Sequence, residues 1–259
     1  MNRLHNLPRS LADSFEKRSL LKVIAGLNNF DADSVERITR AASIGGANLV
    51  DIACDPVLVR SVREVSGIPI CVSAVDPDLF PQAVEAGASI VEIGNYDCFY
   101  PQGRIFDREE VFALTVKTRN LLPDVILSVT VPHILPLDQQ AQLALQLVDL
   151  DVDIIQTEGG TSANPLSPGT LGLVEKAAPT LAATYSIQEC LHKANYDIPI
   201  ICASGLSSVT VPMAIAAGAS GVGVGSAVNR LNDELAMVAS VCSLVESLKN
   251  RNNLTLKYT

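Results

Sequence analysis

Short runs of apolar, β-type residues alternate with longer stretches of helical character from residue 20 onward. The chain has eight such runs, and each is predicted to be a strand: 21–25, 49–53, 70–73, 90–93, 126–130, 154–157, 200–203 and 222–225. The remaining stretches predict helices at about 32–45, 56–66, 78–86, 108–121, 138–149, 170–195, 208–217 and 229–249. Strands that alternate with helices are typical of βαβ units and a parallel sheet.

A repeated sequence pattern supports this count of strands. Residues 46–52 match residues 87–93 position by position, and residues 218–224 follow the same plan. Each copy begins with a glycine that predicts a helix end, because glycine adopts the left-handed cap conformation at little cost. Residues 153–157 fit the same pattern without the glycine. The four copies cover the second, fourth, sixth and eighth predicted strands.

Eight parallel strands with helices between them most simply close into a (β/α)8 TIM barrel, whose site lies at the C-terminal ends of the strands. Such a barrel uses about 250 residues, so a single domain over residues 1–259 is expected. An open doubly wound sheet is the alternative. The residues before 20 predict a short extra helix that closes the bottom of the barrel. Asp55, Asp76 and Asp107 stand where helix N-caps are expected.

Composition narrows the classes of function. Apolar residues make up 48% of the chain and charged residues 18%, which excludes disorder and coiled coil. The net charge is −9 without a long run of like charge, which argues against nucleic acid and anionic membranes as partners. A small phosphorylated ligand remains compatible with this charge, since a few backbone amides can hold a phosphate.

The six cysteines are scattered and form no CxxC pair, which predicts reduced thiols in a reducing compartment. Residues 1–18 do not resemble a secretory signal, so a soluble cytoplasmic protein is expected. Neither HxH, HExxH nor a cluster of Cys and His occurs, so no metal is expected.

The strongest candidate site lies at the ends of the last two predicted strands. Barrels that bind phosphate use backbone amides of the loops after strands seven and eight and the start of a short extra helix. Glycine lets the backbone approach the phosphate, and a side chain at Gly225 is expected to fill the anion's place. The candidate phosphate-binding residues are Ser204, Gly205, Leu206, Gly225 and Ser226. In the alternative interpretation, the glycines at 221, 223 and 225 only allow close packing.

Residues 204–206 and 223–227 look like the standard phosphate-binding motif of ribulose-phosphate-binding and FMN-dependent TIM barrels. Residues 21–31, 156–161 and 203–206 together resemble a Ycf-type family of hypothetical reading frames from cyanobacteria and plastid genomes. This resemblance runs over nearly the whole chain. It implies a TIM barrel in a photosynthetic host, located in the bacterial cytoplasm or the chloroplast stroma, and it brings no assigned reaction.

A second candidate site lies inside the predicted barrel. The repeats place Asp51, Glu92, Gln156 and Gly223 at one level on the even strands, and alternate strands supply one layer of interior side chains. Lys22 can point inward and pair with one of the acids. Buried charges are costly unless paired, so such a cluster marks a functional site. A lysine among carboxylates suits Schiff-base or proton-abstraction chemistry on a sugar-phosphate carbonyl. In the opposite register, these groups would face the helices.

Two long loops add further candidates. Glu158 is the candidate for a second acid or base, and residues 159–169 after it predict a lid, or alternatively a plain connection. Residues 95–107 carry four aromatic residues, Tyr96, Phe99, Tyr100 and Phe106. These rings could stack on a planar ligand, anchor the loop to its own barrel or contact a second subunit. His133 is a weaker candidate for a general acid.

Three classes of function follow from these sites. The first is an isomerase, epimerase or lyase that acts on a small phosphorylated metabolite, with Lys22, Asp51, Glu92 and Glu158 as catalytic residues. The second is a flavoprotein that holds FMN by its phosphate in the same loops. The third is a non-catalytic sensor or interaction protein. A homo-oligomer is compatible with all three classes.

Overall fold

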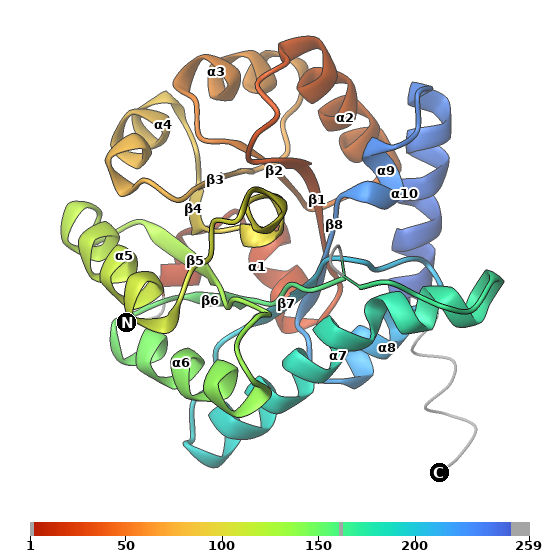
Figure 1. The fold of residues 1–259 in the computed structure, drawn as a ribbon. Helices are drawn as coiled ribbons and strands as arrows, with labels where there is room; N and C mark the ends of the chain where they lie inside the picture. Colours follow the sequence, from red (N-terminus) through yellow and green to blue (C-terminus); the bar gives the residue numbers. More distant parts are fainter. Residues whose placement is uncertain (1–2, 161–162, 250–259) are drawn as a thin grey trace.

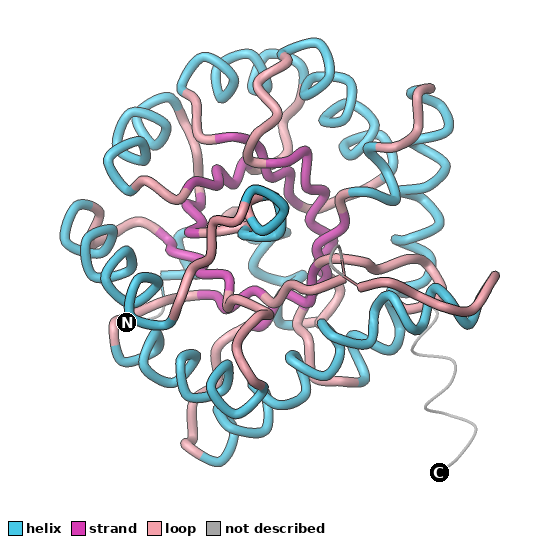
Figure 2. Tube along the Cα trace, viewed as in Figure 1, coloured by secondary structure: helices cyan, strands magenta, loops and turns pink. Residues whose placement is uncertain are grey.

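The computed structural model describes residues 3–160 and 163–249. Eight parallel strands form a closed barrel in sequence order, and helices surround it (Figures 1 and 2). The strands are β1 (Leu20–Gly26), β2 (Leu49–Ala53), β3 (Ile70–Ala74), β4 (Ile90–Ile93), β5 (Ile126–Thr130), β6 (Ile154–Gln156), β7 (Ile200–Ala203) and β8 (Gly221–Val224). The predicted TIM barrel is therefore confirmed, and the open sheet is excluded.

The main outer helices follow the predicted pattern closely. They are α2 (Ala32–Gly45), α3 (Pro56–Val65), α4 (Phe80–Ala86), α5 (Arg108–Leu121), α6 (Leu137–Asp149), α7 (Gly169–Lys193), α8 (Val211–Ala216) and α10 (Glu234–Lys249). The short elements are η1 (Arg3–Asn6), α1 (Arg9–Glu16), η2 (Pro77–Leu79), η3 (Tyr96–Cys98), η4 (Tyr100–Gln102) and α9 (Ser226–Asn229). The last predicted helix, 229–249, begins later than expected, at Glu234, where Asp233 accepts a hydrogen bond from the amide of Ala236. The short helix α9 precedes it.

The predicted caps form as the sequence indicates. The Asp55 carboxylate accepts hydrogen bonds from the amides of Val57 and Leu58 at 2.7 and 3.0 Å. The Asp107 carboxylate accepts one from the amide of Glu110 at 2.8 Å. At the other end of α2, Gly46 has a φ of +89°, the left-handed conformation that ends a helix.

Side chains from the strand starts fill the lower half of the barrel interior with apolar groups. They form a single cluster that comprises Leu20, Leu49, Cys71, Ile90, Ile126, Ile154 and Ile201, among others. Leu11 and Phe15 of α1 belong to this same cluster, so α1 closes the barrel at the N-terminal ends of the strands. This placement confirms the predicted closing helix. A separate and larger core joins the outer faces of the strands to the surrounding helices.

The register of the strands sets the layers inside the barrel. Asp51 pairs with Cys71, whereas Ser73, two residues further along β3, pairs with Glu92 on β4. This step of two residues brings inward side chains of alternate strands to one level. Asp51 of β2, Glu92 of β4 and Gln156 of β6 therefore lie above the apolar cluster, closer to the C-terminal ends of the strands.

The six cysteines are free thiols, of which Cys54, Cys71 and Cys202 are buried. Among the helices of residues 3–160 and 163–249, none is both long enough and apolar enough to cross a membrane.

Candidate functional site

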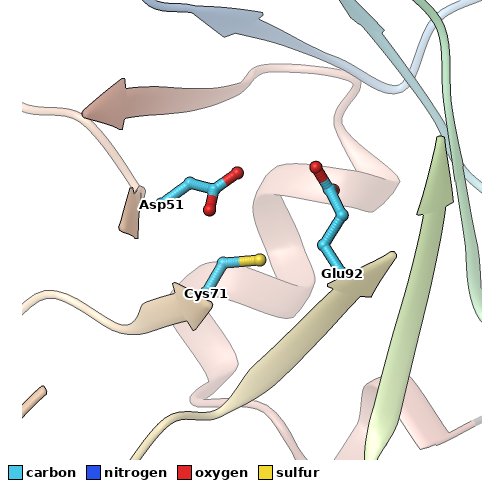
Figure 3. Close-up of side chains that lie close together, drawn as sticks. All are labelled: Asp51, Cys71 and Glu92. Atoms are coloured by element: carbon cyan, nitrogen blue, oxygen red, sulfur yellow. The ribbon is translucent and has the colours of Figure 1, made fainter. Parts of the chain in front are cut away.

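Lys22, Asp51 and Glu92 meet inside the barrel, and we call these three residues the interior charge cluster. The Nζ atom of Lys22 lies 3.0 Å from Asp51 Oδ2 and 2.7 Å from Glu92 Oε2. All three side chains are buried. Figure 3 shows both carboxylates and the Cys71 thiol pointing toward one another within the ring of strands. The inward register is therefore the observed one, while the catalytic role of these residues stays a prediction.

Neighbouring strands supply hydrogen bonds to both carboxylates. The Ser73 hydroxyl donates to Asp51 Oδ1 at 2.6 Å, and the Ser128 hydroxyl donates to Glu92 Oε2 at 2.7 Å. The Gln156 amide donates to Glu92 Oε1 at 2.6 Å. Ser73 and Ser128 were not predicted as part of the site, although a serine inside an otherwise apolar strand was a signal for it.

The cluster holds one ammonium group against two carboxylates. Burial lowers the pKa of Lys22, but the charges of Asp51 and Glu92 outweigh burial and raise it above its ordinary value. Burial raises the pKa of Asp51 to about 6, although Lys22 acts against that rise. The carboxylates thus hold Lys22 as a cation, and burial holds the pKa of Asp51 above its ordinary value.

The barrel mouth is covered by residues 95–107, which we call the mouth loop. The loop contains η3 and η4, and its short helical turns (yellow in Figure 1) lie over the ring of strands. A pocket of about 180 Å³ lies beneath it, lined by Ile24, Gly26, Leu27, Ser73, Asn95, Asp97 and Cys98. Ser73 therefore links this pocket to Asp51, because its hydroxyl donates to that carboxylate.

Glu158 holds the mouth loop in place. Its Oε2 atom accepts hydrogen bonds from the amides of Tyr96 and Asp97 at 3.0 and 3.2 Å. Its Oε1 atom accepts one from the Tyr100 hydroxyl at 2.6 Å and one from the His133 amide at 3.2 Å. Within the described residues, no hydrogen bond or ion pair joins Glu158 to the interior charge cluster. The structure thus places this predicted acid or base apart from the other three.

Asp97 and His133 complete a second group with Glu158, and we call these three residues the mouth cluster. His133 Nδ1 lies 3.2 Å from Glu158 Oε1 and 3.5 Å from Asp97 Oδ1. Burial raises the pKa of Glu158. Burial lowers the pKa of His133, but the hydrogen bond to Glu158 and the charges of both acids raise it above its ordinary value. Asp97 was not predicted as a site residue, and its one signal in the sequence is its position in the aromatic loop that follows a strand.

The aromatic residues of the mouth loop pack on the protein itself. The Tyr96 and Phe106 rings are stacked with centroids 4.6 Å apart, and Phe99 meets Phe106 edge-on at 5.4 Å. The Tyr100 ring lies against His133 at 5.0 Å. Of the predicted roles, anchoring the loop to its own barrel is the one that this packing favours.

The two predicted phosphate loops lie side by side, since β7 and β8 are paired neighbours. Ser204 and Gly205 have φ values of +75° and +74°, and Ser204 is one of few non-glycine residues in this conformation. The Ser204 hydroxyl donates to Asp97 Oδ2 at 2.7 Å, which joins this loop to the mouth loop. Among the hydrogen bonds of the described residues, the amides of Gly205, Leu206 and Gly225 donate to no acceptor.

The glycines of this region differ in what they do. A Cβ on Gly160 would lie 2.4 Å from the Gly205 Cα atom, so the β6 and β7 loops touch only because both are glycine there. A Cβ on Gly225 would lie 3.3 Å from the Ile24 carbonyl oxygen. A side chain at Gly225 would therefore press on β1, and the expectation that it also fills the anion's place stays a prediction. Packing alone accounts for Gly221, where a Cβ would lie 2.5 Å from the Leu20 side chain.

The predicted lid falls partly outside the described residues, because its positions 161 and 162 are not described. At its far end, Glu175 accepts hydrogen bonds from the amides of Leu166 and Ser167 at 2.7 and 3.0 Å. Movement of this loop over the site stays a prediction.

Two solved structures with a similar fold are enzymes named for phosphorylated compounds. One is (S)-3-O-geranylgeranylglyceryl phosphate synthase from Thermoplasma acidophilum in complex with sn-glycerol-1-phosphate. Its TM-score is 0.62 at 14% identity, with 94% of this chain and 100% of that chain covered. Another is thiamine phosphate pyrophosphorylase from Pyrococcus furiosus, with a TM-score of 0.58 at 14% identity. The match covers 91% of this chain and 98% of that chain. At this identity the likeness shows the TIM-barrel fold alone.

Sequence relatives identify the family. The chain is 44% identical over 243 residues to "Uncharacterized protein ycf23" of Cyanophora paradoxa, covering 93% of this chain and 96% of the relative. It is 40% identical over 244 residues to the protein of the same description from Porphyra purpurea. This match covers 94% of this chain and 90% of the relative. The family described as "Protein of unknown function (DUF561)" matches residues 5–254. The predicted Ycf-type resemblance is thus confirmed, and the chain belongs to the DUF561 family.

Proposed function

We propose that this barrel is an enzyme that binds a small phosphorylated metabolite at the loops after β7 and β8. The observation that carries the proposal is that the amides of Gly205, Leu206 and Gly225, which follow two adjacent strands, donate no hydrogen bond among those of the described residues. Free amide groups at such a position are donors suited to phosphate oxygens. The Ser226 hydroxyl at the start of α9 is a further donor to the same anion.

Amide donors explain how an acidic chain can bind an anion. No arginine or lysine side chain is needed, so the net charge of −9 does not oppose the site. The solved structure that holds sn-glycerol-1-phosphate has the same fold and supports the ligand class, though at 14% identity it does not identify the substrate.

The proposed reaction is proton transfer at a carbon next to a carbonyl, as in an isomerase, epimerase or lyase. Asp51 is the proton acceptor, because its pKa of about 6 lets it ionise at neutral pH and still accept a proton. Ser73 lines the pocket and donates to Asp51, so its hydroxyl relays the proton between substrate and carboxylate. Lys22 holds Asp51 in position and is itself held by Glu92, and the ammonium offsets negative charge formed on the substrate.

Schiff-base chemistry at Lys22 receives no support from this geometry. A lysine must lose its proton to attack a carbonyl, whereas the surrounding carboxylates raise the pKa of Lys22. Glu158 acts in this proposal as a positioning residue, because its oxygens already accept hydrogen bonds from the mouth loop.

The same amides would also accept the phosphate of FMN, so the test of the proposal includes this cofactor. The purified chain is heated with glycerol 1-phosphate, ribulose 5-phosphate, FMN or glycerol, and its melting temperature is recorded. Phosphorylated compounds are expected to raise the melting temperature, and glycerol is expected to leave it unchanged. A flavin absorbance band or stabilisation by FMN alone would favour the flavoprotein. Stabilisation by a sugar phosphate without turnover would favour a non-catalytic sensor. If no compound raised the melting temperature, the enzyme, the flavoprotein and the sensor would all be contradicted.

For the location of the protein, we infer the chloroplast stroma or the cytoplasm of a photosynthetic bacterium. The family resemblance supports this inference, since the relatives found include proteins of the algae Cyanophora paradoxa and Porphyra purpurea.

A further inference from the structure

We propose that the mouth cluster of Asp97, His133 and Glu158 is a binding site for a divalent transition-metal cation. The three residues come from η3, from the loop after β5 and from the loop after β6. Their potential ligand atoms, two carboxylate oxygens and His133 Nδ1, all lie within 4.8 Å of one another. This proposal does not depend on the phosphate site or on the proposed reaction.

The spacing of the atoms fits a metal site. With metal–ligand bonds of about 2.1 Å, neighbouring ligand atoms lie about 3.0–3.4 Å apart. His133 Nδ1 is 3.2 Å from Glu158 Oε1 and 3.5 Å from Asp97 Oδ1. Hydrogen bonds between an imidazolium and a carboxylate are typically about 2.7–2.9 Å long, so both contacts are long for that role. A cation between the three atoms would replace the imidazole proton.

The outer oxygens of both acids are held by other groups, as second-shell partners hold metal ligands. Asp97 Oδ2 accepts a hydrogen bond from the Ser204 hydroxyl at 2.7 Å. Glu158 Oε2 accepts hydrogen bonds from two main-chain amides of the mouth loop. These bonds turn Asp97 Oδ1 and Glu158 Oε1 toward His133. Glu158 Oε1 also accepts hydrogen bonds from the Tyr100 hydroxyl and the His133 amide, so a cation would share this oxygen with them. The ligand atoms are therefore oriented before any cation arrives.

The charges also favour a cation. The Glu158 side chain is fully buried, and among the described residues its ion-pair partner is His133, while no lysine or arginine pairs with it. Buried carboxylates are usually paired or bound to a metal. Two carboxylates and one imidazole suit Mn²⁺ or Zn²⁺ better than Ca²⁺, which prefers oxygen ligands alone.

The proposed cation site differs from the prediction, made from the sequence, that the protein binds no metal. That expectation rested on the spacing of ligands along the chain, whereas the ligands here lie 25 or more positions apart, at 97, 133 and 158. Asp97 also lines the pocket under the mouth loop. A bound cation would therefore border the space where the proposed substrate binds.

The test uses the full chain after EDTA treatment, in a buffer free of phosphate. MnCl₂ is added, and free Mn²⁺ is followed by electron paramagnetic resonance, with ZnCl₂ binding measured by calorimetry. One equivalent of cation is expected to bind to the parent. His133→Asn keeps an N–H that can bond Glu158 but removes the imidazole, and it is expected to weaken binding about tenfold or more.

His192→Ala serves as the matched control, because His192 is an exposed histidine on α7. This variant is expected to bind the cation as the parent does. Circular dichroism and the melting temperature show whether His133→Asn is folded, and Asp97→Asn gives an independent variant of a second ligand. The proposal is overturned if the parent binds no cation, or if folded His133→Asn and Asp97→Asn bind it as tightly as the parent.

Discussion

Lys22 on β1 and Glu92 on β4 are joined across the interior of the barrel, with Nζ 2.7 Å from Oε2. Since β1 pairs only with β2 and β8 among the described strands, this contact spans the barrel and does not follow the sheet. The same ammonium lies 3.0 Å from Asp51 on β2. One lysine thus links three strands and forms ion pairs with two buried acids.

Replacing Lys22 with methionine is expected to lower the free energy of unfolding by about 3–5 kcal/mol. The change leaves Asp51 and Glu92 buried without their cation, which is the costly way to break a buried ion pair. Urea unfolding followed by circular dichroism measures the loss.

Asp51→Asn is the matched control for this experiment. In this variant the Lys22 ammonium still faces the Glu92 carboxylate. Asp51→Asn is therefore expected to lower the free energy of unfolding by less than Lys22→Met does. Equal stability of Lys22→Met and the parent would show that the cluster is not a buried ion group.

Asp51 gives the protein a defined pH dependence. Its pKa is raised from 3.8 to about 6 in the folded protein, so the folded state binds this proton more tightly than the unfolded chain. The contribution of Asp51 to stability is therefore fully present below about pH 4 and is lost as the pH rises through 6. The parent is expected to gain stability relative to Asp51→Asn as the pH falls from 7 to 4. Unfolding of both proteins across this range measures the difference, and a constant difference would refute the assignment.

The barrel and its interior cluster could be predicted because both follow from periodicity. The repeat around Asp51 and Glu92 indicated that they share one level, and Lys22 meets both of them from β1 across the interior of the barrel. The mouth cluster could not be predicted in this way. Asp97 and His133 stand on loops, where no period relates one residue to another, and they meet only because the mouth loop folds back over the barrel.

The surroundings of Gly225 are a second feature that could not be predicted from the sequence. A glycine after the last strand indicated a backbone that approaches an anion, but the direction of its missing side chain depends on β1, which begins about 200 residues earlier. The direction toward Ile24 becomes visible only in the closed barrel.

Glu158→Gln is expected to loosen the mouth loop without unfolding the barrel. The neutral side chain accepts weaker hydrogen bonds from the amides of Tyr96 and Asp97, so these amides should exchange with solvent about tenfold faster. Hydrogen exchange read by mass spectrometry measures the change.

Glu175→Gln provides the comparison for the mouth loop. Glu175 holds the amides of Leu166 and Ser167 in a similar way, so its replacement should speed exchange there and leave residues 96 and 97 as they are. Unchanged exchange at 96 and 97 in Glu158→Gln would mean that Glu158 does not hold the loop.

The central claim is that backbone amides of the β7 and β8 loops hold a phosphate, and calorimetric titration with glycerol 1-phosphate tests it most directly. Ser226→Asp places a carboxylate at the start of α9, beside the proposed anion, where like charges repel. Asn120→Asp adds the same charge to the exposed face of α5. The parent and Asn120→Asp are expected to bind glycerol 1-phosphate equally, and Ser226→Asp is expected to lose binding. Equal binding by Ser226→Asp and the parent, or no binding by the parent, would contradict the claim.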